Sequence, residues 1–236
     1  MEDTYISNLD IEPGVSLFAI FEGNDGKEVA IFAQKHFVEQ LLANKNYLKK
    51  DYKQALIDTF LNIDQLLFKP EGQEELKKIK ENNEESQAGC TANVALIVGK
   101  TVYLANAGNL SAILCRDNAP YELSKDHKPD DEKDKRRIEQ AVGFILSPRR
   151  NGIKFSQRKD HLPARRALGY QKYKQNQTSS QEEQIIIALL DVKVEEIQAN
   201  DKLQRFKSLQ IWSDGVFEIW NQQQIIDMEI LRSNQK

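Results

Sequence analysis

The chain has few of the residues that cross-link small secreted domains or fill membrane spans. It contains only two cysteines, Cys90 and Cys115, among 236 residues, which is too few for a disulfide framework. Both lie in apolar runs, so we expect small buried side chains in a reducing compartment. A catalytic cysteine would need a histidine partner, and nothing in the sequence points to one. No apolar stretch approaches the length of a membrane span, and no signal-peptide core follows Met1.

The chain also lacks a strong charge of one sign. Its 33 basic and 36 acidic residues leave a formal net charge of −3, which provides no basic field for nucleic acid. A hydrophobic fraction of 40% is enough to bury the core of one globular domain. We therefore expect a soluble protein of the cytoplasm or nucleus, whose partners are neither nucleic acid nor a membrane.

Hydrophobic periodicity predicts helices and strands in separate blocks. Apolar residues at helical spacing predict helices over 28–42, 52–68 and 130–142, and a last helix from about Gln222. Pro70-Glu71-Gly72 is expected to break the second helix, and residues 73–87 to form a solvated helix end or a loop. Short apolar runs bounded by turn residues predict strands at 16–21, 91–98, 101–106, 111–116, 185–188, 192–197 and 209–213.

The spacing of these elements predicts the fold class. The turns at 98–100 and 107–109 are so short that the strands they join must be antiparallel. Residues 147–181 are irregular and rich in Arg, Lys and Gln, which predicts an active-site flap or a loop. Their basic run could recruit acidic or phosphorylated partners, although such runs are more often solvated loops. Strand-rich blocks interrupted by helices indicate one α+β domain over 1–236, built mainly from antiparallel sheets.

Two predicted strands far apart in the sequence each end on a carboxylate next to a glycine. The first strand ends on Glu22-Gly23, and the last ends on Asp214-Gly215. Carboxylates at the ends of rigid strands commonly hold hard divalent cations, because oxygen ligands must converge on the ion. The alternative interpretation of Asp214 is an ordinary turn aspartate before glycine.

Short motifs follow one another in a recognisable order along the chain. In sequence order they are Met1-Glu2-Asp3, FAIFEGNDG at 18–26, GCTA at 89–92, VYLANAG at 102–108, LSKDHKP at 123–129, Arg137-Ile138-Glu139, ALG at 167–169 with Tyr173-Lys174, Asp191-Val192 and Ser213-Asp214-Gly215. This order resembles that of the metal-dependent protein serine/threonine phosphatases of the 2C (PPM) type. Each motif is weak alone, whereas the full set in order is specific.

The resemblance implies a fold and a chemistry. The implied fold is a four-layer sandwich of two stacked antiparallel β-sheets flanked by helices. The implied reaction is hydrolysis of phosphoserine and phosphothreonine in phosphoproteins, with two Mn²⁺ or Mg²⁺ ions activating a water molecule. The residues that match the family's metal-binding positions are Glu2, Asp3, Glu22, Gly23 and Asp214, with Asp25 and Asn109 as further candidates.

Several of these positions depart from the family pattern. Glu22 stands where the family has the aspartate that bridges both ions, and its extra methylene moves the carboxylate by about 1.5 Å. Asn24 occupies the position of the histidine that helps to protonate the leaving group, and an amide cannot act as a general acid. A glycine, a metal-facing aspartate, an arginine, a serine and another aspartate are replaced by Asp25, Asn109, Ser111, Arg165 and Tyr170 respectively.

Two segments of the family pattern have no counterpart in the chain. The match starts at the acidic motif, so the family's first strand with its phosphate-binding arginine is expected to be absent. The last strand with its Asp-Asn metal motif has no match before Lys236. Missing strands would leave sheet edges that favour aggregation or pairing, in a fragment or a shortened relative. Glu2 and Asp3 have the alternative interpretation of a solvated terminus.

The three histidines do not indicate a zinc site, because none has a cluster of ligand partners nearby. His36 is expected to be structural or exposed within a helix. His127 is expected to fix a turn through hydrogen bonds, and His161 carries little signal.

Three hypotheses about function remain open. The first is a catalytically impaired phosphatase, a pseudophosphatase or regulatory module that binds phosphoproteins or a regulatory protein partner. The second is an active Mn²⁺- or Mg²⁺-dependent phosphatase with a remodelled site. The third is a non-functional fragment, which would not unfold cooperatively. We favour the first, because the changes fall on the general acid, the bridging aspartate and the last metal ligand.

Overall fold

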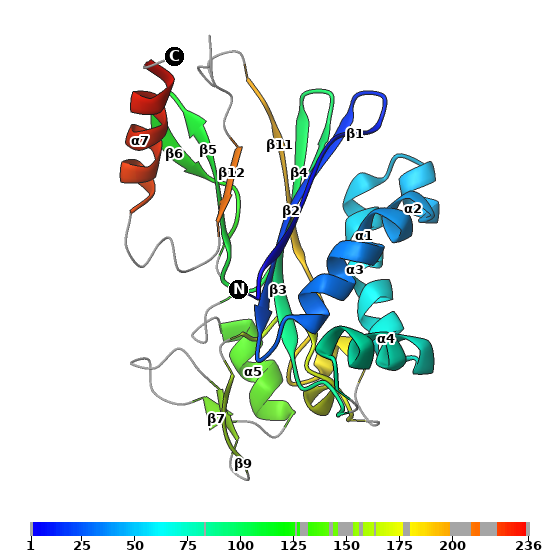
Figure 1. Cartoon of the computed structure of the whole chain (residues 1–236). Helices are drawn as coiled ribbons and strands as arrows, with labels where there is room; N and C mark the ends of the chain where they lie inside the picture. Colours follow the sequence, from blue (N-terminus) through cyan, green and yellow to red (C-terminus); the bar gives the residue numbers. More distant parts are fainter. Residues whose placement is uncertain are drawn as a thin grey trace.

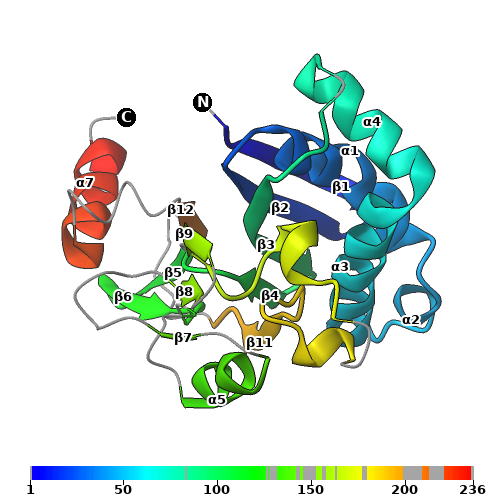
Figure 2. The same cartoon turned by 90° about the horizontal axis from the view of Figure 1, so that it is seen from below.

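Two antiparallel sheets stack against each other between layers of helix (Figure 1). This arrangement is seen in a computed structural model, which describes residues 2–82, 84–125, 127, 132–141, 144–145, 153–155, 158–162, 164–176, 180–198, 209–212 and 221–234. The view from below shows helices on the outer sides of both sheets (Figure 2). The predicted α+β sandwich of two flanked antiparallel sheets is therefore confirmed.

The larger sheet is antiparallel throughout. Its main path runs through β1 (Thr4–Glu12), β2 (Val15–Asn24), β3 (Gly89–Val98), β4 (Thr101–Ala107) and β11 (Asp191–Glu196), and the short β10 (Leu168–Gly169) pairs with the start of β3. β3 is buried at every position from Gly89 to Leu96. This central strand therefore has both of its faces covered, which explains why it reads as a continuous apolar run.

Two smaller sheets complete the strand content of the described residues. One joins β12 (Leu209–Trp212), β5 (Ser111–Arg116) and β6 (Ala119–Glu122), and it stacks on the larger sheet. The other joins β7 (Phe144–Ile145), β8 (Ile153–Phe155) and β9 (Arg158–Leu162). The prediction that residues 147–181 are irregular is therefore wrong for β8 and β9. Their charged sequence lacks the period-two apolar pattern by which strands are recognised.

The helices are α1 (Glu28–Leu42), α2 (Lys45–Leu48), α3 (Tyr52–Phe68), α4 (Pro70–Lys80), α5 (Glu132–Gln140) and α7 (Gln222–Asn234), with short 3₁₀ turns at Gln171–Tyr173 and Gln181–Glu183. α1 and α3 have the predicted bounds. α3 begins where Asp51 accepts a hydrogen bond from the Gln54 N–H, which is the usual N-cap arrangement. Helical periodicity thus located the longest helices correctly.

α4 corrects the prediction of a helix break at Pro70. Proline has no N–H to donate and a fixed φ, both of which suit the first turn of a helix. The new helix covers much of the stretch expected to be a solvated helix end or a loop. It is held by Leu76, which is buried, while most of its residues are charged. Together with the partly buried Ile79, this anchor was too weak a signal in a charged sequence.

Two strand predictions also need correction. β1 was not predicted, because it is an edge strand on which apolar residues such as Tyr5 and Leu9 are 66% and 76% exposed. Residues 185–188 do not form a strand; Ile187 makes a single isolated bridge with Arg166. β1 alternates between half-buried and exposed positions only from Thr4 to Ser7, which is too short a stretch to mark a strand in the sequence.

Apolar clusters fill the gaps between the layers. The largest lies between the larger sheet and the helices α1–α4, where Phe37 contacts Phe21 and Phe60 with ring centroids 5.6 and 5.4 Å apart. Between the sheets lie Ala95, Val102, Leu104, Ala112, Leu114 and Leu123. On the outer face of β5, Ile113 and Cys115 pack against α7. Cys90 and Cys115 are both buried, as predicted, and neither forms a disulfide.

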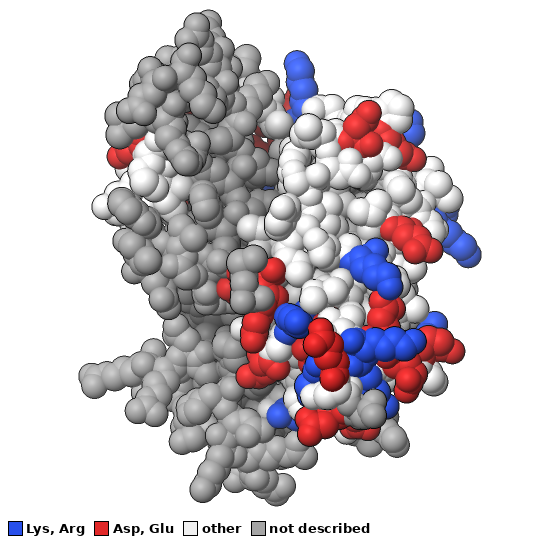
Figure 3. Space-filling model, in the orientation of Figure 1, with Lys and Arg blue, Asp and Glu red and all other residues white. Residues whose placement is uncertain are grey.

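The surface agrees with the balanced charge of the sequence. Acidic and basic side chains are interspersed on the face shown in Figure 3, without a large area of one sign among the described residues. In the described part of the chain, no helix combines the length and the apolar character that crossing a membrane requires.

Candidate functional site

One end of the larger sheet carries polar residues on the face toward the smaller sheet. The cross-strand pairs, in order along β3, are Asn24–Gly89, Glu22–Thr91 and Asn93–Asn106. Directly paired residues place their side chains on the same face, and residues two apart along a strand share that face. Ala95, two residues beyond Asn93, packs between the sheets. Glu22, Asn24, Thr91, Asn93 and Asn106 therefore form one polar patch that faces the smaller sheet.

Glu22 is held in this patch by a side-chain partner. Its carboxylate is buried, and its Oε2 atom accepts a hydrogen bond of 2.9 Å from the Thr91 hydroxyl. Asn24 follows on the same face, and its Nδ2 atom donates to the main-chain carbonyl of Glu22 at 3.2 Å. The position expected for a general acid is thus occupied by a neutral amide that points back along its own strand.

The N-terminal acidic motif meets the loop that follows β2. The Gly26 N–H donates to Oε2 of Glu2 at 3.3 Å. A Cβ atom on Gly23 would lie 2.6 Å from the carbonyl oxygen of Glu2 and 2.8 Å from that of Gly26. Only glycine fits this approach without displacing the backbone. Gly23 therefore lets Glu2 reach the end of β2.

Asp3 lies close to the same end of the sheet. Burial raises the pKa of the Cys90 thiol well above its usual value, and the negative charges of Glu22 and Asp3 raise it further. Cys90 pairs with Gly23 across β2 and β3. Three of the predicted metal residues, Asp3, Glu22 and Gly23, thus lie around one pair of neighbouring strands.

The remaining predicted metal residues have different placements. Asp25 is exposed and has a left-handed backbone with φ of +61°, consistent with a solvent-facing position in the loop. Asn109 is half-buried and follows Gly108, whose missing side chain leaves room for Thr91. Asn109 therefore directly follows a residue whose backbone packs against Thr91, the partner of Glu22. Asp214 lies outside the described residues.

The oxygen atoms at the polar end of the larger sheet only partly match the ligand set that a divalent cation requires. Carboxylate and carbonyl oxygens are the ligands that Mn²⁺ and Mg²⁺ prefer. Within the described residues, however, no group of three His, Cys, Asp or Glu side chains is arranged to hold one ion. One Glu22 oxygen is already engaged by Thr91. The described residues alone therefore do not complete a metal site.

A second polar network links β11 to the turn after β4. The Gly108 N–H donates to Nδ1 of His127 at 3.1 Å, so the proton of the neutral ring is on Nε2, which donates to Asp191 Oδ2 at 2.9 Å. The His127 N–H donates in turn to the Gly108 carbonyl. The prediction that His127 fixes a turn through hydrogen bonds is confirmed. The motif order includes Asp191, but it does not predict the hydrogen bond between Asp191 and His127.

Arg166 extends this network to α5. Its Nη1 atom donates to Asp191 Oδ1 at 2.9 Å, and its Nε atom donates to Asp134 Oδ2 at 3.2 Å. The hydrogen bond from His127, together with the charge and hydrogen bond of Arg166, holds the pKa of Asp191 well below its usual range. The network is structural, because it ties β11, α5 and the turn after β4 together.

This pKa shift predicts a contribution to stability that disappears in acid. The folded-state pKa of Asp191 is lower than its unfolded value of about 3.9, so the contribution is present above pH 4 and is lost as the pH falls below it. Half of the Asp191 side chain is exposed, so solvent screening limits the effect to about 1 kcal/mol. Urea melts of Asp191→Asn between pH 3 and 7 should show a flatter acid limb, whereas Asp10→Asn on exposed β1 should retain the wild-type curve.

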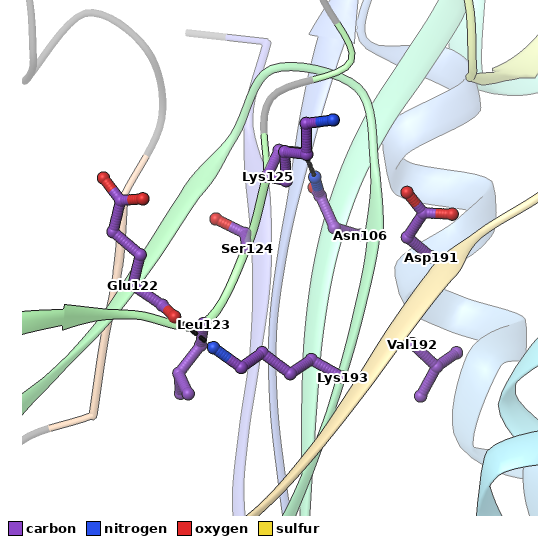
Figure 4. Close-up of a pocket in the computed structure, with 8 residues that line it drawn as sticks. All are labelled: Asn106, Glu122, Leu123, Ser124, Lys125, Asp191, Val192 and Lys193. Carbon is purple, nitrogen blue, oxygen red and sulfur yellow. Dashed lines mark hydrogen bonds between the residues drawn. The ribbon is translucent and has the colours of Figure 1, made fainter. Parts of the chain in front are cut away.

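A cavity of about 450 Å³ opens beside this network. Its lining comes from β4, β11, the end of β6 and the segment that follows β6, namely Asn106, Glu122, Leu123, Ser124, Lys125, Asp191, Val192 and Lys193 (Figure 4). Lys193 crosses the cavity and donates to the Glu122 carbonyl at 2.6 Å. The lining includes two acidic residues, Glu122 and Asp191, and two basic ones, Lys125 and Lys193, so the cavity does not select a ligand of one charge.

Comparison with known proteins agrees with the motif order. Residues 1–236 match the sequence profile of the family described as Protein phosphatase 2C. "Probable protein phosphatase 2C 5" of Paramecium tetraurelia is 52% identical over 238 residues, which cover 100% of this chain and 76% of that protein. "Probable protein phosphatase 2C 21" of Arabidopsis thaliana is 30% identical over 274 residues, covering 100% of this chain and 74% of that protein.

Solved structures with the same fold include members of this family. The serine-threonine phosphatase 2C of Toxoplasma gondii superposes with a TM-score of 0.74 at 17% identity, covering 96% of this chain and 77% of that one. A sex determining protein of C. elegans superposes with a TM-score of 0.72 at 21% identity, covering 96% of this chain and 51% of that one. Identities this low support the fold alone, whereas the profile match and the sequence relatives establish descent. This chain belongs to the protein phosphatase 2C family.

Proposed function

We propose that this domain binds phosphoproteins or a regulatory protein partner and that its hydrolytic chemistry is impaired. Asn24 is the observation that carries the proposal. Its amide lies in the polar patch and donates to the Glu22 carbonyl. An amide neither gains nor loses a proton near neutral pH, so Asn24 cannot protonate the leaving group of a phosphoester.

The same proposal includes weakened metal binding. A bound Mn²⁺ or Mg²⁺ ion would supply Lewis acidity and an activated water. The residues that would hold it are Glu2, Asp3, Glu22, the carbonyl of Gly23, and Asp214. Thr91 restrains the longer Glu22 side chain through one of its carboxylate oxygens. A carboxylate displaced by more than about 0.5 Å from the productive position is a poor bridging ligand.

The alternative is an active Mn²⁺- or Mg²⁺-dependent phosphatase with a remodelled site. The names of the relatives favour it, since proteins 52% and 53% identical to this chain are called probable protein phosphatases 2C. In that case phosphoserine and phosphothreonine would be the substrates, and hydrolysis would disappear in Asp214→Asn. The two functions predict different results in measurements of metal affinity and of metal-dependent turnover.

We also propose an intracellular location, in the cytoplasm or the nucleus. Cys90 and Cys115 are buried thiols that do not form a disulfide. Such thiols in a folded core suit a reducing compartment, and that is where phosphoserine and phosphothreonine signalling partners would be met.

A thermal melt with and without millimolar Mn²⁺ tests the proposal. Since a ligand that binds only the folded state raises its stability, a site with a Kd 100-fold below the Mn²⁺ concentration would add about 2.7 kcal/mol. For a chain of this size the melting temperature would then rise by roughly 5–10 °C. We expect a cooperative melt that Mn²⁺ shifts by less than about 2 °C, in the wild type and in Asp214→Asn alike.

Two other results would contradict this expectation. A large upward shift that is lost in Asp214→Asn would favour the active phosphatase, and phosphopeptide hydrolysis should then be assayed. A non-cooperative melt at every Mn²⁺ concentration would instead favour the non-functional fragment.

A further inference from the structure

Tyr170 lies against the polar end of the larger sheet. Gly169, the residue before it, pairs with Gly89, and Gly89 pairs in turn with Asn24. A Cβ atom on Gly89 would lie 2.0 Å from Cε2 and 2.1 Å from Cδ2 of the Tyr170 ring. The ring therefore occupies the space that a side chain at Gly89 would fill.

This contact places Tyr170 on the same side of the sheet as the polar patch. The side-chain position of Gly89 shares its face with Asn24, its direct cross-strand partner, and with Glu22, two residues earlier on β2. The phenol ring thus stands beside the residue in the general-acid position. Tyr170 and Asn24 are far apart in the sequence, so only the pairing of their strands with β3 brings them together.

The backbone holds the ring in a fixed place. Tyr170 has a left-handed conformation with φ of +50°, and Gly169 before it has φ of +73°. Its N–H donates to the Ala88 carbonyl at 2.9 Å. Non-glycine residues adopt this conformation at an energetic cost and are found more often at functional sites.

A buried ion pair anchors the same segment to α3. Lys174 Nζ lies 2.7 Å from Asp64 Oδ1 and donates to the Ala167 carbonyl at 2.8 Å. Asp64 Oδ1 also accepts from the Gly169 N–H at 2.9 Å. The position of Tyr170 is therefore set by contacts on both sides of it.

The Tyr170 hydroxyl has no hydrogen-bond partner among the described residues, although the side chain is fully buried. Burial and then the negative charge of Asp25 raise the pKa of the Tyr170 hydroxyl, and Glu2 adds a smaller effect in the same direction. The group therefore remains protonated at physiological pH. Phenylalanine would fill the same space without an unsatisfied polar atom, so packing alone does not account for a tyrosine here.

We propose that the Tyr170 hydroxyl donates a hydrogen bond to the phosphoryl group of a phosphorylated side chain bound at this end of the sheet. The inference rests on the proposed binding of phosphoproteins. Phosphoryl oxygens are strong acceptors, and the neighbouring Glu2 and Asp25 carboxylates cannot donate to them. Because these carboxylates repel an anion, the test includes Mg²⁺ as a counter-ion for the phosphate in solution.

The test uses the full chain labelled with ¹³C at the tyrosine Cζ atoms, whose chemical shift reports on hydrogen bonding of the hydroxyl. The sequence has seven tyrosines, and the Tyr170 signal is assigned by its loss in Tyr170→Phe. Inorganic phosphate is titrated in millimolar Mg²⁺, with sulfate at equal ionic strength in a parallel sample. We expect phosphate to move the Tyr170 signal and sulfate to move it less.

Affinity for phosphate and for a phosphothreonine peptide is measured by calorimetry in the same buffer. Tyr170→Phe should weaken both by roughly tenfold or more, because it removes a hydrogen bond to a charged group. It should melt no lower than the wild type, since the hydroxyl makes no hydrogen bond to any residue that the structure describes. Tyr173→Phe is the matched control, because Tyr173 is buried beside Tyr170 and the centroids of the two rings lie 6.2 Å apart.

The outcomes separate this inference from the proposed function. Phosphate binding that leaves the Tyr170 signal and the Tyr170→Phe affinity unchanged would overturn the role of Tyr170 alone. Absence of phosphate and phosphopeptide binding by the wild type would overturn the phosphoprotein-binding part of the proposed function and this inference together.

Discussion

Replacing Glu22 by aspartate and Asn24 by histidine in one variant is expected to raise Mn²⁺-dependent hydrolysis of a phosphothreonine peptide about 10²–10⁴-fold, the range typical of a general acid. The histidine would restore a group that can give a proton to the leaving oxygen. The aspartate would withdraw the carboxylate by about 1.5 Å, toward the position that the family uses. Both residues share one face of β2, so the two changes act on the same site.

The two substitutions should have separable effects. Glu22→Asp weakens the hydrogen bond from Thr91, so we expect a loss of about 1 kcal/mol in the free energy of unfolding. Asn24→His removes only the hydrogen bond to the Glu22 carbonyl, in a half-buried position. Neither loss should prevent folding, and a urea melt of each variant checks this before activity is measured.

Controls determine whether any gained activity comes from this site. Activity should vanish with a chelator and in a triple variant that also carries Asp214→Asn. Each single substitution should give a smaller gain than the pair, because a proton donor and a correctly placed ligand serve the same step. A folded double variant without any gain would show that other departures, such as Asn109 and Ser111, already prevent the reaction.

Lys174→Met is expected to lower the free energy of unfolding by about 3–5 kcal/mol, the effect of removing one partner of a buried ion pair. The pair that Lys174 makes with Asp64 is buried on both sides, and desolvation lowers the pKa of Lys174 and raises that of Asp64. Methionine keeps the length of the side chain but leaves the Asp64 carboxylate in the core without its cation. Urea denaturation at pH 7 measures the loss.

A double variant and a control at an exposed ion pair test whether burial causes the loss of stability. Asp64→Asn added to Lys174→Met should recover much of the stability, because a neutral amide oxygen can still accept the Gly169 N–H. Lys35→Met is the matched control, since Lys35 makes an ion pair of 2.6 Å with Glu75 but is 63% exposed. It should cost less than about 1 kcal/mol. Equal losses in Lys35→Met and Lys174→Met would show that burial does not govern the effect.

The sequence by itself determined the elements that depend on local patterns. The apolar spacing of α1 and α3 and the tight turns around β4 are visible within short windows, so their bounds and pairing could be predicted. The order of the motifs also sufficed to recognise the family, because that order is a property of the chain. The same comparison of motifs identified Glu22 and Asn24 as departures.

Tertiary structure alone decided which distant residues meet. The partnership of His127 with Asp191, the contact of Tyr170 with Gly89 and the ion pair of Asp64 with Lys174 each join segments from separate elements. Strand register and the packing of helices on sheets set these contacts. The physical reason is that local periodicity reports which face of an element is buried, but not which remote residue lies opposite that face.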